Sequence, residues 1–391
     1  MFLLWPADFS FSQLPWFHPY VEVRERFERH VNPSFNAPKG LNRSDLFERY
    51  RLGANLDLGG KFKGTAEYQY INDVFWTRKA NNMVQNSDMS LGYVQYNEGN
   101  STISAGREKF TLGEMRLIGP SEWTNLSRSF DMVRDHAGQW DVWAGTLGMA
   151  NRDTRTVRVA DATHVDSTWG TTSIILKHDV AALGSIDVQT LNHFAKHKFG
   201  NTTVDAEGAL QTGTTNLKDQ RAWAYHARVT EDIGAHTTFS LETDAASGGG
   251  NANTSRTFDN LYASNHGLYG LADTTGWKNM NYLAARVENK TIPAITLRGC
   301  AQTFSLRDAS DAWYGYAGPA NTRAGGIFQD PTGKSGRKLG DEYDFEAIWD
   351  LKKSGNIMVG IAFFKPGDFV QNLTGHSNQM VFGYVQYQIH F

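Results

Sequence analysis

The sequence predicts an all-β fold, a transmembrane antiparallel up-and-down β-barrel, and three observations lead to this prediction. The chain ends in an alternating strand, many other segments alternate in the same way, and tight turns occur between long polar stretches. The last strand has one apolar and one polar face. Its apolar face consists of Val381, Val385, Tyr387, Ile389 and Phe391. We read Tyr387, Ile389 and Phe391 as the C-terminal signal of a barrel, with the terminal strand of a soluble sheet as the alternative.

Composition is compatible with a barrel without requiring one. The 391 residues suffice for one large closed sheet, and the aromatic share of 13% suits the aromatic girdles of such barrels. The mean hydropathy of -0.47 is typical of a soluble protein. It is also compatible with a membrane barrel, because a barrel exposes only alternate residues to lipid and its average hydropathy stays low. The longest apolar run, Ile357 to Phe364, is far shorter than the ~20 residues of a spanning helix.

Several classes of protein are disfavoured by simple counts. A single cysteine, Cys300, excludes an intrachain disulfide and a multi-cysteine metal site. The net charge of -3 gives no reason to expect nucleic acid as a partner. The start of the chain lacks the pattern of a signal peptide, so we expect an export signal to have been removed or replaced by a starter Met. We expect residues 1–391 to form one barrel domain, with 1–16 as an N-terminal extension.

Turns and loops alternate along the chain. A barrel of this kind joins its strands by short periplasmic turns on one side and long extracellular loops on the other. Tight turns are predicted around Gly60, Gly99, Gly138, Gly184, Gly234, Ile292 and Gly355. Long polar stretches are predicted near 30–45, 77–86, 112–128, 151–170, 197–219, 246–275, 308–337 and 367–378.

Alternating segments predict 16 strands, an even number that places both chain ends on the short-turn side; 18 strands also remain compatible with the sequence. A ring this wide cannot fill its lumen with side chains, so the polar faces should point inward and the apolar faces toward lipid. The predicted strands lie near 18–29, 46–58, 62–74, 88–98, 101–111, 129–137, 139–149, 171–181, 185–196, 221–231, 236–245, 279–289, 295–306, 341–352, 356–366 and 379–391.

Several sequence stretches resemble those of one known family. They are Gly106-Arg107-Glu108-Lys109-Phe110, residues 116–119, residues 122–131, residues 259–262 and residues 265–273. The chain resembles the alginate export family of outer-membrane proteins, from about residue 45 to the C-terminus, and the stretch from 106 to 131 is the most specific. The resemblance implies a barrel of 16 to 18 strands with an electropositive lumen that passes an anionic polysaccharide.

Charged residues on the predicted inward faces are the candidates for function. Guanidinium groups bind carboxylates through paired hydrogen bonds and stay charged at any relevant pH, so a row of them would guide an anionic sugar chain. The alternative is that Arg and Glu on neighbouring strands pair and only brace the wall. The predicted pore-lining residues are Arg24, Arg26, Arg49, Arg51, Arg107, Glu108, Arg116, Arg128, Arg228, Arg286, Arg298, Asp344 and Glu346.

The segment from Leu112 to Arg128 is long enough to fold inward and form a constriction that brings Arg116 and Arg128 into the lumen. The alternative is an outer loop. Asn265 and His266 with Asp273 offer one His and two weak ligands, too few for a metal site. We therefore expect no metal and no cofactor.

The sequence also lacks the familiar signatures of enzymes, such as His-Glu-x-x-His or Gly-x-Ser-x-Gly. A His such as His193 or His226 could serve as a base, but nothing singles it out, so we do not expect an enzyme. We expect an outer-membrane channel for passive diffusion of hydrophilic, anionic oligosaccharides or a polysaccharide such as alginate. A general porin, a non-conducting structural or adhesive barrel and a soluble lectin are the alternatives. The expected partners are outer-membrane lipid, lipopolysaccharide, the barrel-assembly machinery and the anionic solute, without nucleic acid.

Overall fold

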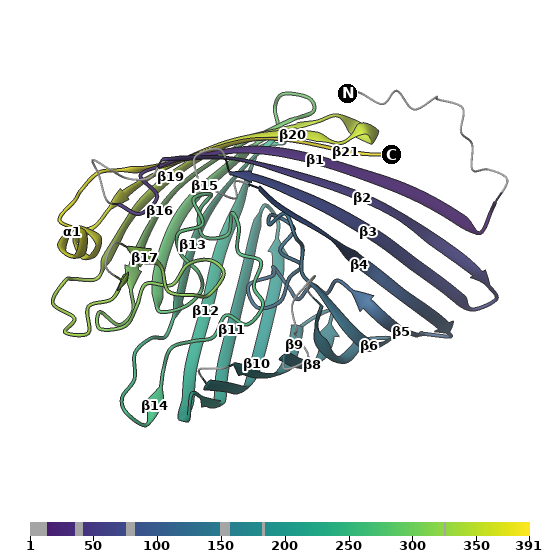
Figure 1. The fold of residues 1–391 in the computed structure, drawn as a ribbon, viewed down its shortest axis with the longest axis horizontal. Helices are drawn as coiled ribbons and strands as arrows, with labels where there is room; N and C mark the ends of the chain where they lie inside the picture. Colours follow the sequence, from purple (N-terminus) through teal and green to yellow (C-terminus); the bar gives the residue numbers. More distant parts are fainter. Residues whose placement is uncertain (1–13, 36–41, 76–82, 149–156, 182–183, 324–325) are drawn as a thin grey trace.

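The structure, a computed structural model, describes residues 14–35, 42–75, 83–148, 157–181, 184–323 and 326–391. Within these residues one large sheet curls into a ring, because β1 pairs with both β2 and β21 (Figure 1). The sheet has 19 strands, and without the two-residue β14 the remaining 18 form a closed antiparallel barrel. The barrel strands are β1 (Phe17–Val31), β2 (Arg43–Gly59), β3 (Phe62–Phe75), β4 (Met83–Glu98), β5 (Ser101–Glu108), β6 (Ser129–Ala137), β7 (Trp140–Gly148), β8 (Val157–Asp166), β9 (Gly170–Ala181), β10 (Gly184–Phe199), β11 (Thr202–Thr215), β12 (Lys218–Ile233), β13 (Thr237–Ala246), β15 (Met280–Asn289), β16 (Ile295–Leu306), β19 (Lys338–Asp350), β20 (Asn356–Pro366) and β21 (Met380–His390).

The remaining elements are short. Among the described residues, no helix has both the length and the apolar composition needed to cross a bilayer. The short elements are β14 (Thr254–Ser255), β17 (Thr322–Arg323), β18 (Gly326–Ile327), η2 (Lys352–Ser354) and α1 (Asp368–Thr374).

The outer face of the ring is apolar and the inner face polar, as the alternation predicted. Leu52, Val133 and Leu283 are 62%, 61% and 55% exposed, whereas the charged side chains of Arg51 and Glu242, which face the lumen, are almost fully buried. A soluble protein rarely exposes a continuous band of large apolar residues. The band therefore suits a bilayer.

The C-terminal strand closes the ring with the predicted face outward. Val385, Tyr387 and Phe391 are exposed on the outside. The Phe391 N–H donates to the Val21 carbonyl at 3.0 Å, and the Val21 N–H donates back at 3.1 Å. The final residue is therefore paired with β1, and its aromatic ring lies at the edge of the apolar band.

The prediction of 16 strands was two too low. β8 lies in the stretch 151–170, and β11 lies in the stretch 197–219, both of which were predicted as loops. Small residues dominate the outward faces of these strands, for example Ala160 and Ala162 on β8 and Ala206 and Gly208 on β11. The outward face of β11 has only Val204 and Leu210 as large apolar residues, on either side of Ala206 and Gly208, so neither strand has a strong alternating signal.

Because two strands were missed, the prediction placed one connection at the wrong end of the barrel. We call the end of the barrel that holds the start of β1 and the end of β21 the turn end, and the opposite end the loop end. Each strand reverses the chain direction, so the connection at Gly184, which follows only one missed strand, lies at the loop end. The short turns that the prediction lacked, at 167–169 and 200–201, lie at the turn end with the turns at Gly60, Gly99, Gly138 and Gly234.

Described parts of the long connections 109–128, 247–279 and 307–337 fold into the ring near the loop end, where their buried side chains form part of the core. Trp313 and Phe328 of the third connection pack on Phe35 with ring centroids 5.9 and 6.1 Å away. Trp313 also packs on the inward-facing Phe364 of β20 at 5.9 Å. The lumen near the loop end therefore contains an apolar core formed by loops, in addition to the polar wall.

Candidate functional site in the lumen

Four arginines form a ladder on the inner face of β1 and β2. Arg24 and Arg26 lie on β1, and Arg49 and Arg51 lie on β2, with Arg24 opposite Arg49 in the register of the two strands. Residues two apart on a strand share a face, so the sequence spacing brings these side chains together. All four are almost fully buried inside the barrel.

The ladder holds the tip of the connection 109–128, which folds inward. The carbonyl of Glu122 accepts hydrogen bonds from Arg24 Nη1 at 2.5 Å and Arg49 Nη1 at 3.1 Å. The carbonyl of Trp123 accepts one from Arg26 Nη1 at 2.7 Å, and Arg51 Nη2 donates to Ser127 at 2.8 Å. This geometry agrees with the inward fold predicted for the segment from Leu112 to Arg128, and it makes the ladder a set of loop anchors.

The Glu122 carboxylate is surrounded by three cations. Its Oε2 lies 3.0 Å from Nη1 of Arg49 and 3.0 Å from Nη1 of Arg51, and its Oε1 lies 2.8 Å from Nζ of Lys109. Burial opposes ionisation of this carboxyl, but the neighbouring cations outweigh it and hold the pKa of Glu122 well below its usual value of 4.5. The cluster therefore keeps one ionised carboxylate in place.

The base of the same loop is fixed to the opposite wall through Arg116. This side chain is fully buried, and its guanidinium lies 3.0 Å from Glu242 and 3.4 Å from Asp244, both on β13. It also contacts Glu114 at 2.9 Å. A buried cation that lost these partners would be left uncompensated, so Arg116 is a clamp for the loop.

Two other predicted arginines join this network from the wall. Arg228 on β12 pairs with Asp205 at 3.0 Å and with Glu114. Arg286 on β15 pairs with Glu242 at 3.0 Å and donates to the Gly267 carbonyl at 3.2 Å. These side chains line the lumen wall but are engaged with acids and loop carbonyls.

Arg128 joins two of the infolded connections. Its Nη1 donates to the carbonyls of Gly119 at 2.9 Å and Ala263 at 3.1 Å, and also to that of Tyr262. The main chains meet here as well, since the N–H of Gly119 donates to the Tyr262 carbonyl at 3.0 Å. Burial lowers the pKa of Arg128 to about 10. The two loops thus form one unit inside the barrel.

Acidic side chains on β19 hold the connection 247–279, which we call the second loop; the connection 109–128 is the first loop. The N–H of Ala272 donates to Glu342 at 3.0 Å, and that of Leu271 donates to Asp344 at 3.2 Å. Glu346, two residues further along the strand, pairs with Arg298 at 3.0 Å. Glu346 and Arg298 lie nearer the turn end, and there the side chain of Arg298 is 49% exposed.

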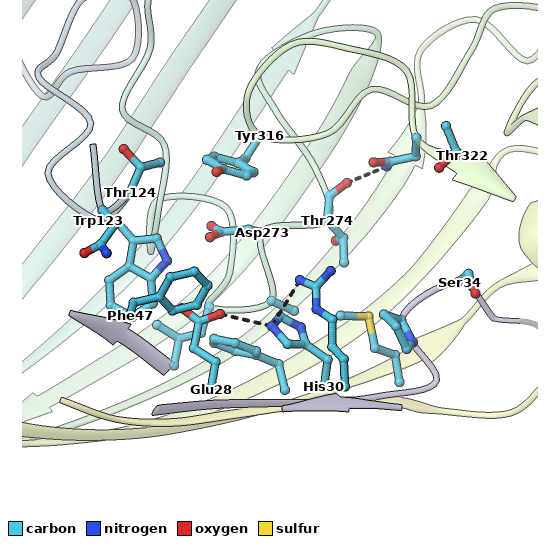
Figure 2. A pocket seen from close by; sticks show the side chains of 18 of the residues that line it. Glu28, His30, Ser34, Phe47, Trp123, Thr124, Asp273, Thr274, Tyr316 and Thr322 are labelled. Atoms are coloured by element: carbon cyan, nitrogen blue, oxygen red, sulfur yellow. Dashed lines mark hydrogen bonds and ion pairs between the residues drawn. The ribbon is translucent and has the colours of Figure 1, made fainter. Parts of the chain in front are cut away.

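A cavity of about 610 Å³ remains between the β1–β3 wall and the infolded loops. Figure 2 shows Glu28 and His30 on the wall, with Trp123, Asp273 and Tyr316 facing them from the loops. Aromatic faces and polar groups therefore alternate around it.

The indole of Trp123 forms the centre of a stack beside this cavity. The Arg26 guanidinium lies 3.7 Å from the Trp123 ring, and the His266 ring is parallel to it at 3.5 Å. His266 in turn lies 2.8 Å from Asp273, whose pKa is raised by burial, an effect that His266 only partly offsets. Wall, first loop and second loop are stacked together at one point.

The comparison of sequences decides the family. Residues 179–384, more than half of the chain, match the profile of the alginate export family. The chain belongs to the alginate export family. The resemblance seen in the sequence is thereby confirmed, and with it a place in the bacterial outer membrane. No curated protein sequence matches the chain.

Solved structures agree on the fold of this alginate export family member. Three Pseudomonas aeruginosa structures are similar to it: OccK5 (OpdH), with a TM-score of 0.62, 11% identity and 97% and 99% of the two chains covered; OccK2 (OpdF) in complex with glucuronate, with the same four values; and the outer membrane protein opdK, with 0.62, 12%, 97% and 100%. Such low identity supports the architecture alone. Family and fold are those of outer-membrane channels, which are not enzymes, and this chain is an outer-membrane channel.

One predicted pore-lining residue of this family member is misplaced. Arg107 and Glu108 are adjacent on β5, so they cannot both face the lumen. Glu108 points inward and is buried, where Ser104 donates to it at 2.5 Å. Arg107 lies on the outer side and pairs with Asp131 at 2.6 Å. Arg107 is therefore corrected to an outward-facing residue.

Three residues of the cavity, His30, Arg43 and Tyr316, were not among the predicted pore-lining residues, because the segment 30–45 was predicted as a loop and Tyr316 lies in another. Arg43 has a side chain that is 37% exposed, and it lies 3.0 Å from Asp45 and 3.2 Å from His30. The alternation that marked Arg49 and Arg51 also covers Arg43, because odd-numbered residues of β2 face inward. Tyr316 could not be found in this way, because it lies in a connection without regular structure.

In the described residues, the side-chain groups that could hold a metal ion are already paired with arginines. Three groups of side chains lie close enough to share an ion: Glu28, His30 and Asp45; Glu114, Asp205 and His226; and His226, Glu242 and Asp244. Arginines already pair with each group, for example Arg26 with Glu28 at 2.8 Å and Arg116 with Glu242 at 3.0 Å. His266 and Asp273 are occupied by each other and by the Trp123 stack.

Proposed function

We propose that this outer-membrane channel lets hydrophilic anionic sugars diffuse passively, and that short uronate oligosaccharides such as alginate fragments are its preferred solutes. The cavity between the β1–β3 wall and the loops carries the proposal. Its volume of about 610 Å³ falls in the range of ~300–1,000 Å³ that small-molecule sites occupy.

The lining of the cavity suits a sugar acid. The rings of Trp123, Tyr316 and Phe47 offer flat apolar surfaces, while Arg26 and Arg43 offer hydrogen-bond donors and positive charge. A guanidinium matches the two oxygens of a carboxylate. The Arg49, Arg51 and Lys109 cluster supports the same preference further along the lumen.

Two comparisons are consistent with this proposal. The family is named for alginate export, and alginate is a polyanion of sugar acids. The similar OccK2 is itself seen in complex with glucuronate, a single sugar acid. The apolar core that the loops form in the lumen near the loop end narrows the space for a solute, which favours short oligomers over a long polymer.

A general porin with little selectivity is the second candidate. The acids Glu28, Asp73 and Asp273 also line the cavity and balance its cations. A mixed lining of this kind would accept neutral and charged sugars alike.

Current block in planar bilayers separates the two candidates. We expect the purified channel to conduct, and alginate oligomers to block its current at about tenfold lower concentration than neutral oligosaccharides of the same length, a difference of about 1.4 kcal/mol. Equal block by both would support the general porin, and an absence of conductance would reject both candidates.

A further inference from the structure

We infer that Glu122 is an intrinsic competitor of the solute: its carboxylate occupies a site made by Arg49, Arg51 and Lys109 that the carboxylate of a sugar acid takes when the Glu122 side chain turns away. This inference rests on the proposed function and adds to it a second, deeper binding position and the residue that limits its affinity.

The contacts of Glu122 are those that a bound sugar acid would make. Both carboxylate oxygens are engaged, one by Arg49 and Arg51 at 3.0 Å each and the other by Lys109 at 2.8 Å. Charge-assisted hydrogen bonds from guanidinium and ammonium groups are the strong contacts in carboxylate recognition. The site is thus built for a carboxylate and filled by one from the chain itself.

Glu122 is the accessible member of this cluster. Its side chain is 40% exposed to the lumen, whereas those of Arg49 and Arg51 are 2% and 4% exposed. Water and solute can therefore reach the carboxylate, and they reach the two arginines only where the carboxylate leaves.

The side chain can leave without releasing the loop. The main chain of Glu122 is held by its own carbonyl, which accepts from Arg24 and Arg49 at 2.5 and 3.1 Å. Asn125 adds a further anchor through Asp73 at 2.5 Å. A rotation of the Glu122 side chain breaks none of these bonds.

The charge balance favours replacement by another anion. With Glu122 in place, Arg49, Arg51 and Lys109 pair with three carboxylates, those of Glu22, Glu67 and Glu122, and a fourth cation, Arg24, lies beside them on the carbonyls of Glu122 and Thr124. When Glu122 turns away, two carboxylates remain near four cations. Cations buried beyond their counter-ions are costly, so an entering carboxylate would be stabilised there.

The site follows the cavity along the lumen. Glu28 and Arg43 line the cavity near the loop end, whereas Glu22 and Arg51 lie closer to the turn end on the same two strands. A solute that enters at the loop end meets the cavity first and the Glu122 site second. Two successive weak sites allow a solute to bind and still to leave.

The test measures block of the channel current by glucuronate and by glucose in planar bilayers. We expect Glu122→Gln to lower the half-blocking glucuronate concentration about fivefold and to leave the glucose value unchanged, because removing one carboxylate from a partly exposed ion pair is worth about 1 kcal/mol. We expect Lys109→Met to raise the glucuronate value by a similar factor, since it removes one of the three cationic donors of the site. Folding of each variant is checked by the heat-dependent gel mobility of the barrel.

The matched control is Glu288→Gln. Glu288 also pairs with two cations, Arg298 at 2.8 Å and Lys290 at 2.6 Å, but lies outside the cluster. This variant removes the same charge, and we expect it to change the half-blocking glucuronate concentration less than twofold.

The possible results separate the two proposals. If the unaltered channel prefers glucuronate but Glu122→Gln and Lys109→Met both match it, Glu122 is no competitor and only this inference is lost. Equal shifts in Glu122→Gln and Glu288→Gln would also overturn it, because they would show a general charge effect. If glucuronate and glucose block the unaltered channel equally, the proposed function itself fails.

Discussion

At the scale of single residues, Arg128 and Arg107 lie in the same stretch of sequence but on opposite sides of the barrel wall. Arg128 is buried between two loops and donates to three main-chain carbonyls. Arg107 pairs with Asp88 and Asp131 on the outer side of the wall. Both belong to the stretch that resembles the family, yet one holds the contents of the lumen and the other braces the exterior.

We predict that Arg128→Met loosens the two loops and leaves the barrel intact. Each hydrogen bond from a charged group contributes about 1.5–3 kcal/mol, and the acceptors left behind are buried, so the loops should separate part of the time. Single-channel recordings should show a higher conductance with frequent steps between levels. The control, Arg107→Met, removes an equal charge outside the lumen and should keep the original conductance; a similar change in both variants would contradict the role given to Arg128.

At the scale of elements, the second loop depends on a close fit to β19. Gly270 has a φ of +87°, and a Cβ at this position would lie 2.3 Å from Oε1 of Glu342. That carboxylate accepts the N–H of Ala272, and its neighbour Asp344 accepts that of Leu271. Gly267, in the same turn, has a φ of +73° but meets nothing within 4 Å.

We predict that Gly270→Ala detaches this turn from the wall, whereas Gly267→Ala only adds local strain. Both variants carry the cost of a left-handed side chain, about 1–2 kcal/mol, but Gly270→Ala also loses the two hydrogen bonds to β19. Hydrogen exchange of a peptide that contains Leu271 and Ala272 should be clearly faster in Gly270→Ala than in Gly267→Ala. Equal exchange in the two variants would show that the carboxylates of β19 do not hold the loop.

At the scale of the whole molecule, the band of exposed apolar side chains determines which surface meets lipid. Leu52 lies within this band and is 62% exposed. Leu217 is 97% exposed but lies in the connection between β11 and β12 at the loop end. Two exposed leucines therefore sit in different surroundings.

We predict that Leu52→Arg lowers the free energy of unfolding in lipid vesicles by about 2–4 kcal/mol, the cost of an arginine near the middle of the bilayer. Leu217→Arg should lower it by less than about 0.5 kcal/mol, as surface substitutions usually do. Urea titrations of tryptophan fluorescence in vesicles measure both values. Equal losses in the two variants would mean that Leu52 does not face lipid.

The alternation of side chains was sufficient to predict most of the wall. Strands β1 and β2 have large apolar residues on one face and a row of charges on the other, whereas β21 opposes its apolar face with Gln386 and Gln388; all three strands were found from the sequence. β8 and β11 were missed because alanine and glycine on the outward face weaken this contrast. The ladder of Arg24, Arg26, Arg49 and Arg51 followed from the same period of two.

The sequence by itself determined that the chain forms a closed sheet with a charged interior, because a two-residue period fixes which side chains share a face. Only the tertiary structure decided what those charges touch. Arg24 and the carbonyl of Glu122 are 98 residues apart in the chain and 2.5 Å apart in the barrel. Contacts of this kind depend on how a loop packs inside the ring, and no local pattern encodes them.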